Sequence, residues 1–407
     1  MSELAQSATG YLEFLCRQLP GRCVGTPGNK VATDWFAKAA AAFGFRVETP
    51  GFDCLGWEQA GAELSSLDRS FAVLPSPYSL GCDVRGELAV AGTFEELQQA
   101  EAEGRVLLVH GKLARQQLMP KRFPFYNPEE HQQIISWLEL KRPLAIVAAT
   151  GRDPDLAGGI CPFPLIEDGD FDIPCAHMTQ AEGLDLSRRA GQSVELKIRA
   201  RRSPARGCNV QASKGPLDGR RVVVFAHIDA KLGTPGALDN AAGVAALLLL
   251  AELLQPISLA LAVELVAMNG EDYYSAPGEQ LYVQQNQERF GEIVLGINVD
   301  GAGDRHGDTA FSLYGCPPEI AGIVRQSFGG WPGMIEGEAW YQSDHSLFVM
   351  HHRPALAATS ARFTELWSVI AHTELDVPEL VSPDKLGYLA LALRDVVVGL
   401  QGLGSIA

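Results

Sequence analysis

The sequence predicts an α/β protein built on a mixed, mostly parallel sheet that helices cover on both faces, with a smaller β-rich domain inserted into it. Three observations support this prediction. With 407 residues, the chain is long enough for two domains. After about residue 205, apolar strand-like runs alternate with helical runs, as in parallel βαβ units. Before that point, short β-like runs are separated by Gly, Pro and Asp.

The first fifty residues predict two helices and a strand. Apolar residues recur at helical spacing between residues 3 and 19, and an Ala-rich second helix follows over residues 31–43. Residues 45–52 then alternate between apolar and polar side chains, as a strand does. The chain therefore begins as helix, helix and strand.

The inserted β-rich domain is predicted over residues 55–199, where one helical segment near 129–140 interrupts the short β-like runs. Residues 1–54 and 200–407 are assigned to one main domain. A final helix is predicted to begin at Pro383. Before it, strand-like and helical patterns alternate over five segments of the main domain: 221–227, 243–254, 258–268, 279–290 and 293–300.

Composition and charge narrow the possible functions. Acidic residues outnumber basic residues by 49 to 33, and the formal net charge of −16 disfavours binding to the phosphate backbone of a nucleic acid. The most apolar stretch, residues 241–251, is shorter than the roughly 20 residues that span a bilayer, so no membrane partner is expected. Eight scattered cysteines and an acidic, polar N-terminus unlike a secretory signal predict a reduced, cytoplasmic protein.

Residues that suit metal chemistry follow the predicted strands of the main domain. His227 and Asp229 come directly after an apolar run, and because they are two residues apart on an extended segment, they project to the same side. Asp239 precedes a strongly apolar helix. In open α/β sheets, ligands bind beyond the carboxyl ends of the strands, where all three of these residues are expected.

Further positions repeat this placement. The adjacent acids Glu271 and Asp272 follow the next apolar strand and project in different directions, so one can bind a metal while the other faces a water molecule. Asp300 ends another apolar strand, and His372 lies in a loop before the final helix. Any one of these acids alone is more often a helix cap or a loop end, but their shared position indicates a site for zinc, manganese or cobalt.

These motifs resemble those of the co-catalytic dizinc aminopeptidases, whose relatives include bacterial leucine aminopeptidases, glutamate carboxypeptidases and glutaminyl cyclases. The resemblance spans residues 1–50 and about 205–400. Segments 21–29 and 343–348 also look like the family's. The family's main motifs are met here by five segments: 227–229, 236–240, 271–272, 298–300 and 372–376.

The resemblance implies a role for each site residue. Glu271 would be the general base that accepts a proton from a water activated by two metals, and Asp229 would orient His227. The main domain would be the metallopeptidase catalytic domain, and the insert resembles a protease-associated domain. Two divalent metal ions, expected to be zinc, would share Asp239, with one further pair of ligands on each ion: His227 and Asp300, and Asp272 and His372.

The implied function is that of a metallo-aminopeptidase, a hydrolase that removes N-terminal residues from peptides. A carboxypeptidase or another amidohydrolase on the same site is the alternative. A glutaminyl cyclase needs one zinc and typically lacks the first histidine, so His227 disfavours it, and a non-catalytic binding relative would have lost its ligands.

One residue departs from the family pattern. The family usually has two glutamates where this chain has Glu271 and Asp272, so metal spacing or affinity is expected to differ at Asp272. The sequence leaves the preferred side chain of the substrate, the native metal and the oligomeric state open.

Overall fold

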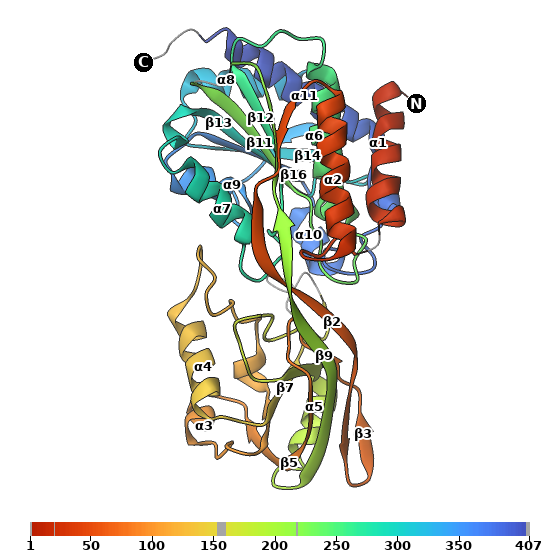
Figure 1. The fold of residues 1–407 in the computed structure, drawn as a ribbon, viewed down its shortest axis with the longest axis vertical. Coiled ribbons are helices and arrows are strands. Elements are labelled where there is room, and N and C mark those ends of the chain that lie inside the picture. The colour runs from red at the N-terminus through yellow and green to blue at the C-terminus, as the bar shows by residue number, and fades with distance from the viewer. Residues whose placement is uncertain (1, 20, 153–159, 217–218, 404–407) are drawn as a thin grey trace. The chain divides into compact units, whose positions relative to one another are not determined.

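The computed structural model describes residues 2–19, 21–152, 160–216 and 219–403. The chain forms two compact units (Figure 1). Unit 1 comprises Met1–Cys54, Arg206–Leu366 and Ile370–Ala407, and unit 2 comprises Leu55–Ala205 with Trp367–Val369. That unit 2 is a protease-associated domain stays a prediction.

Unit 1 contains an eight-stranded mixed sheet in the order β1-β10-β12-β11-β13-β16-β14-β15. Every residue of its three central strands is buried, which explains their continuous apolar sequences. Four strands run parallel: β11 (Arg221–His227), β12 (Ala262–Met268), β13 (Ile293–Val299) and β16 (Ala355–Ser360). The outer strands, which include antiparallel pairs, are β1 (Arg46–Glu48), β10 (Val210–Lys214), β14 (Thr309–Tyr314) and β15 (Met334–Glu336).

Helices cover both faces of this sheet, as predicted (Figure 1). The second predicted helix begins four residues early, at Pro27, because Thr26 caps it by accepting a hydrogen bond from the N–H of Asn29. One face carries α1 (Glu3–Glu13), α2 (Pro27–Ala42), α6 (Ala242–Leu254) and α11 (Pro383–Gln401), which pack on one another. The other helices of unit 1 are α7 (Pro277–Asn286), α8 (Pro318–Gly329) and α9 (His345–Met350), and α10 (Phe363–Val369) begins in unit 1 and ends in the three residues assigned to unit 2.

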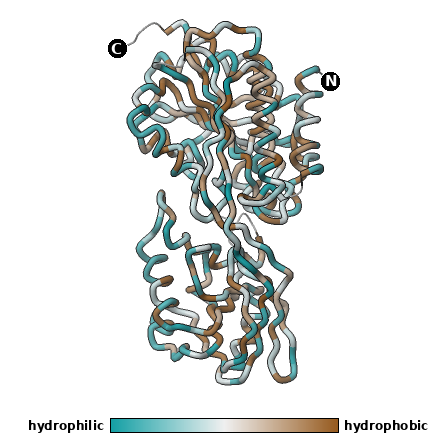
Figure 2. The backbone as a smooth tube through the Cα atoms, in the orientation of Figure 1, coloured by the Kyte–Doolittle hydropathy of each residue, from teal (hydrophilic) through white to brown (hydrophobic). Residues whose placement is uncertain are grey.

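The apolar helix α6 is the core helix of unit 1. Figure 2 shows hydrophobic residues concentrated along the central strands and the helices that cover them. Within the described residues, Ala237–Leu254 is the one helical stretch long and apolar enough to span a membrane, and 89% of it is buried inside the structure. Burial in the core of unit 1 accounts for its composition.

Unit 2 contains a second eight-stranded sheet, in the order β3-β2-β9-β5-β6-β7-β8-β4. The helical segment predicted near 129–140 is α4 (Glu129–Leu140), while α3 (Phe94–Gln99) and α5 (Gln180–Ser187) are too short to show a clear helical period in the sequence. The strands are β2 (Gly51–Ser66), β3 (Arg69–Phe71), β4 (Leu74–Pro75), β5 (Cys82–Ala91), β6 (Val106–Val109), β7 (Ala145–Thr150), β8 (Cys175–Thr179) and β9 (Ser193–Cys208).

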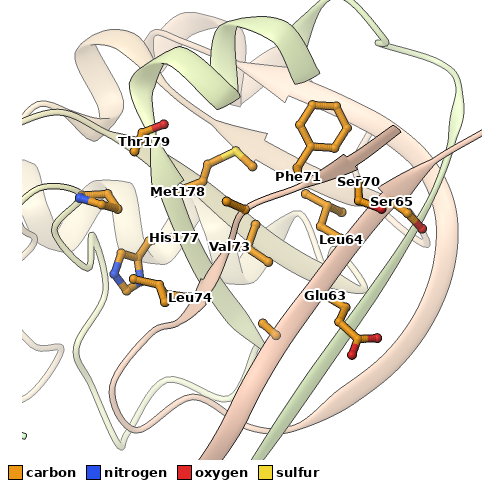
Figure 3. A pocket seen from close by; sticks show the side chains of 13 residues that line it. Glu63, Leu64, Ser65, Ser70, Phe71, Val73, Leu74, His177, Met178 and Thr179 are labelled. Atoms are coloured by element: carbon orange, nitrogen blue, oxygen red, sulfur yellow. The ribbon is translucent and has the colours of Figure 1, made fainter. Parts of the chain in front are cut away.

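The two edge strands of this sheet, β3 and β4, are only two residues apart in the chain, so the sheet curves back on itself. A cavity of about 540 Å³ lies at this junction (Figure 3). Phe71, His177 and Met178 are among its lining residues. None of the predicted metal ligands lines it, so this cavity is separate from the predicted site.

Candidate metal centre

The predicted site residues of unit 1 gather where the order of the parallel strands reverses. Strand β12 lies on one side of β11 and β13 on the other, which is the position at which open α/β sheets form a ligand-binding crevice. His227 is the last residue of β11, and Asp300 directly follows β13. The loop after β12 carries Glu271 and Asp272 to the same edge of the sheet.

Asp239 lies between two imidazoles. Its Oδ1 is 2.9 Å from Nε2 of His227, and its Oδ2 is 3.0 Å from Nε2 of His372. Asp300 Oδ1 is 3.6 Å from Nε2 of His227, and Asp272 Oδ1 is 3.0 Å from Nε2 of His372. The five side chains therefore form two groups of three that share Asp239, and the potential ligand atoms of each group lie within 4.8 Å of one another.

The polar atoms of these groups fit a pair of metal ions. Two carboxylate oxygens of these groups are buried and have no hydrogen-bond partner among the described residues: Asp272 Oδ2 and Asp300 Oδ1. A buried polar atom left unpaired in this way costs about 1–3 kcal/mol. Imidazole and carboxylate ligands suit zinc, manganese and cobalt. The arrangement confirms the prediction of two divalent metal ions.

The charges of the ligands depend on one another. Burial lowers the pKa of His227, but the carboxylates of Asp229 and Asp239 outweigh burial and raise that pKa well above its usual value. The pKa of His372 is raised in the same way, against burial, by Asp272 and Asp239. Burial raises the pKa of Asp239, but the two histidines outweigh it and hold that pKa below its usual range. Metal ions compete with these protons, so affinity should rise with pH.

Asp229 is bound to the turn after β12. Its Oδ1 accepts a hydrogen bond from the N–H of Gly270 at 2.8 Å, and its Oδ2 accepts one from the N–H of Asp272 at 3.1 Å. The distance from its Oδ1 to Nδ1 of His227 is 3.7 Å, which is too long for a direct hydrogen bond. Asp229 thus fixes the main chain that carries the acid pair, and its orientation of His227 stays a prediction.

Hydrogen bonds also restrain two of the candidate ligands, Asp239 and Asp300. Asp376 accepts hydrogen bonds from the N–H groups of residues 238 and 239, at 2.8 and 3.0 Å. Asp300 Oδ2 accepts one from the hydroxyl of Ser343 at 2.6 Å, and that hydroxyl accepts one from the side-chain amide of Asn298 at 2.8 Å. These side chains lie in the motifs that indicated the site, but the sequence did not predict these contacts.

Glu271 lies beside the ligands but outside both groups. Desolvation raises the pKa of Glu271 well above its usual range. His227 lowers this pKa, and the carboxylates of Asp272 and Asp300 raise it further. Sequence reasoning missed Asp344, whose two buried carboxylate oxygens have no hydrogen-bond partner among the described residues. Burial raises its pKa to about 7. The motif at 343–348 contains Asp344, but a motif does not show burial.

Comparison with known proteins agrees with this geometry. Residues 209–397 match the model of peptidase family M28. A probable lipoprotein aminopeptidase of Mycobacterium tuberculosis, LpqL, is 25% identical over 238 residues, which are 56% of this chain and 44% of LpqL. The chain therefore spans less than half the length of this relative. The family match confirms the resemblance inferred from the motifs.

Two solved structures share the fold across both units. The aminopeptidase from Aneurinibacillus sp. strain AM-1 has a TM-score of 0.72 and 19% identity, with 97% of this chain and 93% of that chain covered. BSAP, a zinc aminopeptidase from Bacillus subtilis, has a TM-score of 0.74 and 17% identity, with 97% and 94% covered. At this level of identity the likeness concerns the fold alone, and it confirms the predicted α/β architecture.

Proposed function

We propose that this chain, whose residues 209–397 match peptidase family M28, is a metal-dependent aminopeptidase that removes N-terminal residues from peptides with two zinc ions. The observation that carries the proposal is the position of Asp239, which directs one carboxylate oxygen to each of two imidazoles, at 2.9 and 3.0 Å. The aminopeptidase activity named for the relative LpqL and for the two structural neighbours supports the choice of substrate.

The residues around the metal centre have separate tasks in this mechanism. When bound, the metal pair would lower the pKa of a water molecule and polarise the scissile carbonyl. Glu271 accepts a proton from the attacking water and delivers it to the leaving amine. Glu271 lies outside both ligand groups, so its carboxylate is available for this proton transfer. Asp229 holds the turn that carries Glu271, and Asp376 holds the main chain at Asp239.

A substrate screen with the zinc-loaded protein tests the proposal. Peptides with a free N-terminus should be cleaved, a chelator should abolish cleavage, and zinc, manganese or cobalt should restore it. Full activity in the metal-free protein would overturn the proposal. Cleavage of N-blocked substrates alone would instead indicate a carboxypeptidase or another amidohydrolase, and cyclisation of N-terminal glutamine would indicate a cyclase.

A pair of variants separates the general base from its neighbouring ligand. Glu271→Gln should retain both metals and lower kcat by about 10²-fold or more, the usual scale of general acid–base catalysis. The matched variant Asp272→Ala should lose metal, because Asp272 belongs to one ligand group and Glu271 to neither. If Glu271→Gln emptied the site while Asp272→Ala stayed loaded and active, the two roles would be reversed.

We also propose that the protein works in the cytoplasm. The sequence has eight scattered cysteines without the dense spacing of a disulfide framework, which is usual in a reducing compartment. Fractionation of cells that express the full chain should recover it with cytoplasmic markers. Recovery in an exported or membrane fraction would contradict this location.

A further inference from the structure

Arg22 is a buried arginine, 2% exposed, in the segment between α1 and α2. Its guanidinium donates hydrogen bonds to main-chain carbonyls and uses all three of its nitrogens. Four such bonds are present: Nε to Ile228 at 3.1 Å, Nη1 to Leu15 at 2.8 Å and to Pro235 at 2.9 Å, and Nη2 to Gly236 at 2.9 Å. The Arg22 side chain therefore joins the N-terminal helical segment to two separate points of the loop that follows β11 in unit 1.

That loop runs from the end of β11 to Asp239. Ile228 follows His227 directly, and residues 235 and 236 lie four and three positions before Asp239. The guanidinium thus holds both ends of the loop that separates a ligand of one metal from the ligand shared by both. A displacement of either end would change the 2.9 Å distance between His227 Nε2 and Asp239 Oδ1.

Asp376 holds the same loop by accepting hydrogen bonds from the loop's main-chain N–H groups. Its carboxylate accepts from the N–H groups of residues 238 and 239, and its main-chain carbonyl accepts from the N–H of Ala237 at 3.2 Å. The guanidinium of Arg22 therefore donates to the carbonyls of residues 235–236, while the carboxyl group of Asp376 accepts from the amides that follow. Hydrogen bonds to charged groups are stronger and more directional than neutral ones, so this pair restrains the loop closely.

The loop has little room to move away from Arg22. Gly236 has a φ of +61°, in the left-handed region that favours glycine. A Cβ atom added to Gly236 would lie 2.9 Å from Nη2 of Arg22 and 2.6 Å from the carbonyl oxygen of Asp239. The backbone at Gly236 therefore packs directly between the guanidinium and the residue that the two ligand groups share.

Asn29 links Arg22 to the loop that carries the acid pair. Its side-chain nitrogen donates to the carbonyl of Arg22 at 2.9 Å and to Oδ1 of Asn269 at 2.8 Å. Asn269 donates back to Oδ1 of Asn29 at 3.0 Å and lies two residues before Glu271. The N-terminal segment 21–29 therefore contacts the loops after both β11 and β12.

We propose that Arg22 is a positioning residue for the metal centre. It fixes the loop between β11 and Asp239 so that the two oxygens of Asp239 face two metal sites at once. Arg22 lies outside residues 209–397, the segment that matches the peptidase family. The inference rests on the proposed function in one respect, because it requires that the protein bind two metal ions.

Arg22→Lys tests this role, because lysine keeps the charge but cannot reach four carbonyls with one fixed planar group. Arg221→Lys is the matched control. Arg221 is 4% exposed, begins the strand that His227 ends, and pairs with Glu264 and with Asn286, 3.1 and 2.7 Å away. Both variants should lower the stability of the metal-free protein, but only Arg22 contacts the loop to Asp239.

The readout is the affinity for zinc, titrated against a competing chelator well below the unfolding temperature. Arg22→Lys should weaken zinc binding by about 10- to 100-fold, the usual effect of removing a group that orients metal ligands. Arg221→Lys should bind zinc as the wild-type protein does. Wild-type affinity in Arg22→Lys, or an equal loss in both variants, would show that Arg22 has only a structural role and overturn the proposal.

If Arg22→Lys does not fold, a second variant tests whether Arg22 positions the metal centre. Asn29→Ala removes the hydrogen bond to the Arg22 carbonyl and should weaken zinc binding to a smaller extent, whereas unchanged affinity would overturn the proposal. Peptidase assays of the wild-type protein separate this inference from the proposed function. Two bound metals without peptide cleavage would refute the function alone, and wild-type protein that binds no zinc would refute both.

Discussion

An Asp229→Asn variant keeps the shape of a side chain that is 1% exposed and removes its charge. Asp229 accepts hydrogen bonds from the N–H groups of Gly270 and Asp272, at 2.8 and 3.1 Å. Asparagine has a single acceptor oxygen, so one of the two N–H groups would face an NH₂ donor. The substitution therefore breaks one bond of this turn and leaves a buried N–H unpaired.

The size of the effect follows from the charge of the lost acceptor. A hydrogen bond to a charged group contributes about 1.5–3 kcal/mol, so the free energy of unfolding should fall by about that amount. The looser turn also carries Asp272, whose Oδ1 is 3.0 Å from Nε2 of His372. Zinc affinity at this site should fall by about 10- to 100-fold. The site of His227 should change less, because its Nδ1 is 3.7 Å from Asp229.

Two measurements check this expectation. Stepwise zinc titration against a chromogenic chelator gives one dissociation constant for each site, and denaturant unfolding of the metal-free protein gives its stability. Asp168→Asn is the control, because Asp168 is 3% exposed, lies in unit 2 and accepts from the N–H groups of Lys121 and Asp170, both at 2.7 Å. The control should lose similar stability and keep both zinc affinities.

Two results would refute the reasoning. Wild-type stability together with wild-type affinity at both sites would show that Asp229 does not hold the turn after β12. A loss confined to the site of His227 and Asp300 would show that Asp229 acts on the imidazole, as the resemblance implied, and that its bonds to the turn are secondary.

The remaining predictions concern the shared ligand and the pH dependence of unit 2. Asp239→Ala removes the carboxylate common to both ligand groups, so elemental analysis should fall from about two zinc ions per chain to well below that number; two retained ions would contradict a bridging role. Burial lowers the pKa of His177 to about 4, below the value of about 6.5 in an unfolded chain. Its contribution to stability is therefore present above pH 6.5 and lost as the pH falls toward 4, by about 2 kcal/mol at pH 5. Urea unfolding of His177→Gln should depend less on pH between 7 and 5 than that of the wild-type protein, and an equal dependence would contradict this assignment.

The parallel sheet could be predicted from the sequence because its central strands are buried on both faces. Burial of every residue in β11, β12 and β13 requires continuous apolar runs, and these runs are visible without a structure. The start of α2 was less visible, because its cap at Thr26 lies in a turn-rich segment before the Ala-rich pattern begins. The helices α3 and α5 were missed because six and eight residues show too few turns for a period to emerge.

The candidate metal ligands could be selected from the sequence because their chemistry depends on side-chain type. Histidine and aspartate at the ends of successive apolar strands are uncommon enough as a set to indicate a site, and the structure brings all five into two adjoining groups. The partners of Arg22 had no such signal. All four are main-chain carbonyls, which every residue possesses, so no sequence pattern could identify residues 228 or 235–236 as the acceptors.

Substitutions of ligands and substitutions of the residues that position them should therefore affect the metal centre differently. A ligand such as Asp272 is defined by its own side chain, so replacing the family's usual glutamate changes one arm of one site. The loop that carries Asp239 is defined by charges at a distance in sequence, Arg22 on its carbonyls and Asp376 on its amides. A change at either of these two positions should therefore alter both metal sites at once, although Arg22 itself is not a ligand, because the residue that they move belongs to both groups.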